Sequence, residues 1–112
     1  MASMSDEQAT QMVGEKGLRT FTKNTITDPA RYLDELRTVR RDGFAVDNEE
    51  YISGVRAVAS LISAGGRRNA AIWVVGFTPS MTDEKMATTA VETRRAAEAI
   101  GRILDGREER MP

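Results

Sequence analysis

The chain of 112 residues contains neither cysteine nor histidine. Without cysteine it has no disulfide, no thiolate chemistry and no zinc–thiolate site. Without histidine it lacks the commonest general base, the commonest metal ligand and every nucleophile that depends on a histidine partner. These two absences argue against an enzyme, and we expect no catalytic residue, no metal and no cofactor.

An excess of charge of one sign and long apolar runs are missing as well. With 16 basic and 17 acidic residues the formal net charge is -1, so the chain has no overall field that attracts DNA, RNA or an anionic membrane. No apolar run approaches the roughly 20 residues that span a bilayer. The start, Met1 to Asp6, lacks the basic region and apolar core of a signal peptide. We therefore expect a single cytoplasmic domain.

Two stretches in the first half carry helix signals. Ser5 and Gln8 have the spacing of a capping box, which predicts a short helix after Ser5. Asp28 precedes a proline, a pair typical of a helix start. Apolar residues then recur at steps of three and four, and Gly43 is placed to end the element. We predict a helix over residues 29–42.

The second half predicts two strands and a long helix. Residues 55–62 and 70–77 are rich in β-branched side chains, and residues 63–69 between them contain the Gly-Gly pair of a hairpin. Thr82 can cap a helix, expected over residues 83–104, whose first turn is acidic.

Between these halves, residues 43–54 hold three clustered carboxylates, Asp47, Glu49 and Glu50. We interpret the segment as a short strand at 44–46 that runs into an acidic turn. The carboxylates could act as acid and base or hold a divalent ion. Alternatively they cap backbone groups and pair with Arg56. The structural interpretation is favoured for Glu49 and Glu50. For Asp47 the structural and the chemical interpretations both stay open.

The order helix, helix, three strands, helix predicts an α+β domain with an antiparallel sheet and flanking helices. Three helices are few for two apolar sheet faces, so we expect one face to meet a partner or form a pocket. Residues 1–4 are interpreted as an added leader, and residues 105–112 as a flexible tail.

The chain resembles the IclR family of bacterial transcription regulators from Ser5 to Gly101. No single residue type is diagnostic, but the ordered set and its spacings are specific. The motifs are Thr25-Ile-Thr-Asp28, Leu33-Asp-Glu-Leu36, Val39-Arg40, Gly43-Phe-Ala-Val-Asp47, Glu49-Glu50, Gly54-Val-Arg56, Ala70-Ala-Ile72, Gly76 and Thr82-Asp83.

The resemblance implies a two-part regulator. In the family a winged helix-turn-helix binds DNA, and a C-terminal GAF-like domain binds a small effector and forms homo-dimers or tetramers. Residues 5–104 would be the later part of that effector domain, in a shortened form. The DNA-binding domain is absent from this chain, so DNA would be a partner only through that absent domain.

The resemblance also implies an effector site. Asp47 occupies the family's acidic position, and Ala57, Trp73 and Val75 lie where the strands would face the effector. Members that bind small carboxylates tend to have small polar residues there. A wall of indole and valine should instead prefer an aromatic or otherwise apolar acid.

Four further positions match the family motif: Glu49, Glu50, Gly54 and Arg56. We interpret Gly54 as turn geometry and Arg56 as one half of a structural ion pair. A lone tryptophan in an apolar strand is more often core than ligand contact. The alternative function is therefore a pure assembly domain whose pocket is filled by Trp73. An enzyme that uses the acidic cluster ranks third.

Overall fold

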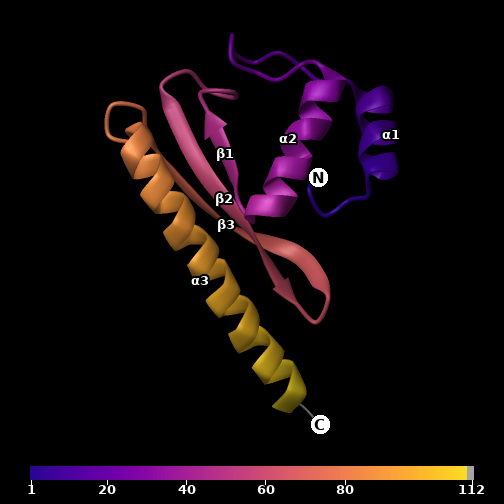
Figure 1. The fold of residues 1–112 in the computed structure, drawn as a ribbon, viewed down its shortest axis with the longest axis vertical. Coiled ribbons are helices and arrows are strands. Elements are labelled where there is room, and N and C mark those ends of the chain that lie inside the picture. Colours follow the sequence, from indigo (N-terminus) through magenta and orange to yellow (C-terminus); the bar gives the residue numbers. More distant parts are fainter. Residues whose placement is uncertain (111–112) are drawn as a thin grey trace.

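The computed structural model describes the backbone of residues 1–110 and the side chains of residues 1–68 and 70–106. The chain forms three helices and a three-stranded antiparallel sheet in the order β1-β2-β3 (Figure 1). The predicted α+β architecture is confirmed. The elements are α1 (Asp6–Lys16), α2 (Pro29–Asp42), β1 (Ala45–Asn48), β2 (Val55–Ala64), β3 (Arg67–Phe77) and α3 (Asp83–Arg110).

The ends of α1 and α2 follow from their caps. Ser5 Oγ accepts from the Gln8 amide at 3.1 Å, and Gln8 Oε1 accepts from the Ser5 amide at 3.1 Å. Both halves of the predicted capping box are therefore present. Asp28 caps α2 through the Ala30 amide, and Gly43 ends it with φ 81°, a conformation that favours glycine. The predicted bounds of this helix are confirmed.

The last helix is longer than the sequence indicates. It runs to Arg110, six residues past the predicted end at Leu104. Beyond Leu104 the apolar stripe stops, but arginine and glutamate are good helix formers and Gly106 is tolerated. Asp105 ties this part to the β2–β3 turn by accepting from the Gly65 amide at 2.5 Å. Flexibility of residues 105–112 stays a prediction, and 111–112 lie outside the described residues.

The helix α3 lies along one face of the sheet and packs against β2 and β3 (Figure 1). Small side chains let it approach closely. A Cβ added at Gly101 would lie 2.4 Å from the carbonyl oxygen of Ser63, and one added at Gly76 would lie 2.5 Å from Met81. Val58 is fully buried, and small residues of α3 such as Ala97 are buried as well. The main core is therefore thin and built from small residues.

The opposite sheet face is only partly covered. Pairing sets Ala59 opposite both Ala45 and Trp73, and Ala57 opposite Val75, so these side chains share one face. Trp73 is 67% exposed. The helix pair α1 and α2 lies to one side of the sheet (Figure 1). The expected uncovered sheet face is thus present in the described chain.

Candidate functional site

The acidic cluster forms a tight turn in which each carboxylate accepts from a backbone amide. Asp47 lies in β1, and its Oδ1 accepts from the Glu50 amide at 2.8 Å. Glu50 Oε2 accepts from the Asn48 amide at 3.1 Å. Glu49 Oε1 accepts from the Gly54 amide at 2.6 Å. Each of the three carboxylates therefore stabilises the turn through a hydrogen bond to a backbone amide.

The loop before α2 supports this turn. Glu49 has φ 56°, a left-handed conformation that costs a non-glycine residue free energy unless its surroundings hold it. Three side chains of this loop donate to carbonyl groups of the turn, from Thr22 to Glu49, from Asn24 to Asn48 and from Thr25 to Glu50. Sequence reasoning missed this support, which has no local signature.

Arg56 does not pair with the glutamates of the acidic turn. Its guanidinium donates to Asp83 at 2.9 Å and to the carbonyl oxygen of Met81 at 2.8 Å. It also donates to the side chain of Asn48 at 2.9 Å. The expected pairing with Glu49 or Glu50 is wrong, because strand alternation turns Arg56 toward the α3 side. Gly54, with φ 83°, lies at the turn between β1 and β2.

The four residues predicted to meet an effector share one sheet face. Asp47, Ala57 and Val75 are register partners in one row across the three strands. Trp73 stands one row further, opposite Ala59. Ala57 is buried at 2% exposure, Asp47 is half-buried and Val75 is 44% exposed. Trp73 is two-thirds exposed. The structure of the described residues therefore does not support the alternative in which its indole fills the effector site.

A cavity of about 590 Å³ lies between α2 and this same face. Its floor consists of alanines from all three strands, and α2 and the segment after it provide apolar walls. Two arginines are the only charged side chains in its lining. The lining residues are Met1, Ala2, Tyr32, Leu36, Val39, Arg40, Gly43, Phe44, Ala45, Ala59, Ser60, Leu61, Ser63, Arg68 and Ala71. Sequence reasoning missed this cavity, because it depends on where α2 lies relative to the sheet.

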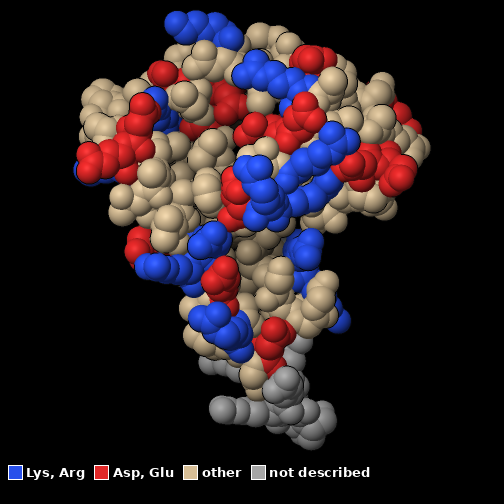
Figure 2. All heavy atoms as spheres, viewed as in Figure 1, with Lys and Arg blue, Asp and Glu red and all other residues tan. Residues whose placement is uncertain are grey.

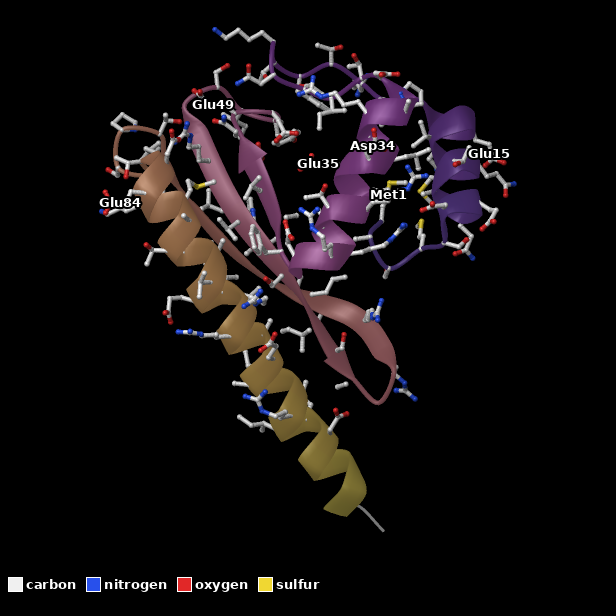
Figure 3. All side chains as sticks on the ribbon, viewed as in Figure 1. Met1, Glu15, Asp34, Glu35, Glu49 and Glu84 are labelled. Carbon is white, nitrogen blue, oxygen red and sulfur yellow. The ribbon has the colours of Figure 1, made fainter. Side chains whose placement is uncertain are left out.

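A second, polar cavity of about 390 Å³ lies beside the acidic turn. Its lining includes Glu35 of α2, which Figure 3 places between α2 and β1. Burial, then the charges of Asp47 and Glu35, raise the pKa of Glu50 above its usual value. Burial and the charge of Glu50 raise the pKa of Tyr32. Lys23 and Arg31 belong to the same lining, so charges of both signs meet at this cavity.

Charges of both signs are interspersed on the face of the molecule drawn in Figure 2. Within residues 1–110 no helix is both long enough and apolar enough to cross a bilayer. Together, the fold and the cavities define a small α+β domain with two ligand-sized hollows beside α2. None of Asp47, Ala57, Trp73 and Val75 belongs to the lining of either hollow.

Comparison with known proteins identifies the family. The sequence profile "Bacterial transcriptional regulator IclR C-terminal" matches residues 1–102. The chain therefore belongs to the IclR family and corresponds to its C-terminal, effector-binding domain. The acetate operon repressor of Salmonella typhimurium is 31% identical over 101 residues, which are 89% of this chain and 37% of that repressor.

Solved structures agree with the profile. The IclR protein of Thermotoga maritima superposes with a TM-score of 0.83 at 30% identity, over 93% of this chain and 42% of that one. The inducer-binding domain of PobR from Acinetobacter, a double mutant in complex with 3-hydroxybenzoic acid, gives a TM-score of 0.79 at 25% identity. That match covers 86% of this chain and 55% of the PobR domain. The chain thus spans a little over a third of the repressor and about half of an inducer-binding domain.

Proposed function

We propose that this chain senses a small-molecule effector and mediates self-association within a bacterial IclR-type regulator. DNA binding would belong to a domain outside this chain. The mechanism is thermodynamic, because an effector that prefers one quaternary arrangement shifts the population toward it and changes the spacing of the attached DNA-binding domains. Such a module acts in the cytoplasm and needs no catalytic residue, metal or cofactor.

The row formed by Asp47, Ala57 and Val75 is the observation that carries this proposal. It combines an oriented carboxylate with two apolar residues, a buried alanine and a partly exposed valine. Asp47 Oδ1 is held by the Glu50 amide, whereas its Oδ2 makes no hydrogen bond to the described residues. That oxygen can accept from an effector hydroxyl or amide.

The composition of this face supports an aromatic or apolar acid as the effector. Trp73 offers an exposed ring next to the row, and aromatic rings stack at offsets that contribute about 0.5–1.5 kcal/mol beyond area burial. The similar PobR domain has been solved with 3-hydroxybenzoic acid. This aromatic ligand supports the proposal of an aromatic acid as the effector of a chain with the same fold.

The exposed apolar residues on β3 support self-association. Trp73 and Phe77 are 67% and 73% exposed, and β3 is an edge strand. Apolar surface of this kind and unpaired strand edges favour association with another chain. Light scattering should give a mass above that of one chain, and a Phe77→Lys variant should shift it toward the monomer. A monomeric wild type would refute the assembly part of the proposal.

Calorimetric titration of the full-length regulator with aromatic acids and short keto acids tests the sensing part. At least one aromatic acid should bind and change operator affinity, and Asp47→Asn should weaken that binding. Glu84→Gln is the matched control, since Glu84 is an exposed acid at the start of α3 (Figure 3). If no acid binds, or if binding leaves operator affinity unchanged, the sensing function is wrong.

A further inference from the structure

The cavity between α2 and the sheet has a chemistry that differs from that of the rest of the surface. The protein as a whole is close to neutral, yet the cavity is lined by two arginines and by no aspartate or glutamate. Its other walls are largely apolar, with Leu36, Val39 and Phe44 on one side and the alanine floor on the other. Mostly apolar pockets with a few polar groups are typical of small-molecule sites.

The two arginines are not equivalent. Arg40 pairs with Asp6 at 2.5 Å and donates to the carbonyl groups of Ala2 and Met4. Hydrogen bonds from Arg40 and Arg37 hold the pKa of Asp6 below its usual value. The charge of Arg40 is therefore used to hold the start of the chain on α2.

Arg68 lies in β3, just after the turn, and is exposed. It makes no side-chain hydrogen bond and no ion pair with the residues that the structure describes. Arg68 thus belongs to the lining of a largely apolar cavity, and its guanidinium carries five donors in a planar fork that matches a carboxylate.

We propose that this cavity binds an apolar carboxylic acid, with the carboxylate at Arg68 and the apolar body on the floor of Ala45, Ala59 and Ala71. The volume of about 590 Å³ lies within the range for small-molecule pockets. The inference adds a second site to the proposed function, on which its regulatory meaning rests. Binding itself rests on the cavity and its charge.

The neighbouring polar cavity has a lining of mixed charge, with Glu35 and Glu50 but also Lys23 and Arg31. The cavity beside α2 differs from it because no carboxylate belongs to its lining. Trp73 serves as a reporter, because it is the chain's only tryptophan and stands opposite Ala59 of the cavity floor.

Titration of the 112-residue chain with 4-phenylbutyrate, followed by tryptophan fluorescence and calorimetry, tests the proposal. 4-Phenylbutan-1-ol has the same apolar body without the charge and should bind about tenfold more weakly, because a charge-assisted hydrogen bond is lost. Arg68→Gln should weaken phenylbutyrate binding by about the same factor and leave binding of the alcohol unchanged. Arg67→Gln is the matched control, since Arg67 is exposed but does not line the cavity.

A second variant tests the location without changing charge. Ala71→Phe places a ring on the cavity floor and should abolish binding of both ligands. Ala70→Phe, at the neighbouring exposed alanine outside the lining, should not. Thermal melting of both variants verifies folding. If phenylbutyrate does not bind, or if Arg68→Gln and Ala71→Phe bind it like the wild type, the proposed site is wrong.

Failure of this site and failure of sensing give different results. Phenylbutyrate binding that depends on Arg68, without any change in operator affinity of the full-length regulator, would support the site and contradict its regulatory role. An aromatic effector that changes operator affinity and responds to Asp47→Asn but not to Arg68→Gln would support sensing and overturn this site.

Discussion

The Asp47 carboxylate and the Glu50 backbone amide form a hydrogen bond of 2.8 Å between Oδ1 and N. This contact closes the turn around Glu49, whose φ of 56° is otherwise unfavourable. It also fixes the direction of a carboxylate that stands in a row with Ala57 and Val75. The structural and the ligand-binding interpretations of Asp47 are therefore compatible, because one oxygen serves the turn and the other faces no described donor.

Substitution of Asp47 should separate these two tasks. Asp47→Ala removes the acceptor for the Glu50 amide and should lower the free energy of unfolding by about 1 kcal/mol, as for a lost side-chain cap. Asp47→Asn retains an acceptor oxygen and should cost clearly less. Urea denaturation of both variants measures the difference. Equal losses would mean that the charge, and not the hydrogen bond, stabilises the turn.

Glu50 should make stability depend on pH in a defined direction. Its pKa is raised in the folded state, chiefly by burial, so the folded protein binds this proton more tightly than the unfolded chain. Stability therefore falls as pH rises from the ordinary glutamate value of 4.5 through the raised folded value. Glu50→Gln should remove this part of the slope and be more stable than wild type at neutral pH.

Urea midpoints measured between about pH 4 and pH 7 would show the effect. Glutamine keeps an oxygen that can accept from the Asn48 amide, so the hydrogen-bond pattern of the turn is preserved. Glu84→Gln, at an exposed acid of α3 outside the acidic turn, should leave the slope in this window largely unchanged. A Glu50→Gln variant with the wild-type slope would contradict the assigned direction.

Local signals in the sequence predicted most elements of the fold. The cap at Asp28 and the stop at Gly43 set the bounds of α2 correctly, because both act within one helical turn. The Gly65-Gly66 pair, with φ 57° and 74°, marked the hairpin turn. The end of α3 was missed because the apolar stripe stops at Leu104, whereas the helix continues through good helix formers to Arg110. The contact between Asp105 and Gly65, 40 residues apart in sequence, also has no local signal.

The site was harder to predict because its parts meet only in the folded chain. The family resemblance grouped Asp47 with Ala57, and the strand register places both on one face. Strand alternation gives the side on which Arg56 lies but does not identify its partner. The support of the acidic turn by Thr22, 27 residues before Glu49, has no local signature. The cavity between α2 and the sheet depends on where α2 lies beside the strands, and the sequence pattern shows only that the alanines of its floor are small.

Arg56 and Asp83 should contribute unequally to stability although they form one ion pair. The Arg56 side chain is 15% exposed and also binds Met81 and Asn48, whereas the Asp83 side chain is 95% exposed. Arg56→Met should cost about 1–3 kcal/mol, because buried polar groups lose their donors. Asp83→Asn should cost less than about 1 kcal/mol, as is usual for surface pairs.

A double-mutant cycle on these two residues would isolate the pair itself. We expect a coupling free energy of about 0.2–1 kcal/mol that shrinks at high salt. Most of the loss in unfolding free energy caused by Arg56→Met should persist in a protein that already carries Asp83→Asn. A coupling as large as the whole effect of Arg56→Met would show that the exposed carboxylate, and not the Met81 carbonyl, holds the arginine.

Gly101 should tolerate no side chain, because α3 touches the sheet there. A Cβ at this position would lie 2.4 Å from the backbone carbonyl oxygen of Ser63, which cannot rotate away as a flexible side chain can. Gly101→Ala should therefore lower the free energy of unfolding by about 1–3 kcal/mol, as overpacking does, despite the better helix propensity of alanine. Chemical denaturation measures this loss.

Gly106 provides the matched control within the same helix. It has no heavy atom within 4 Å of an added Cβ, so Gly106→Ala should show the gain in propensity alone, about 0.5–1 kcal/mol. The opposite signs of the two substitutions would establish that α3 is held against β2 by backbone contact at Gly101. If Gly101→Ala were also stabilising, α3 would lie further from the Ser63 strand than described, and the face opposite the effector residues would be more loosely packed.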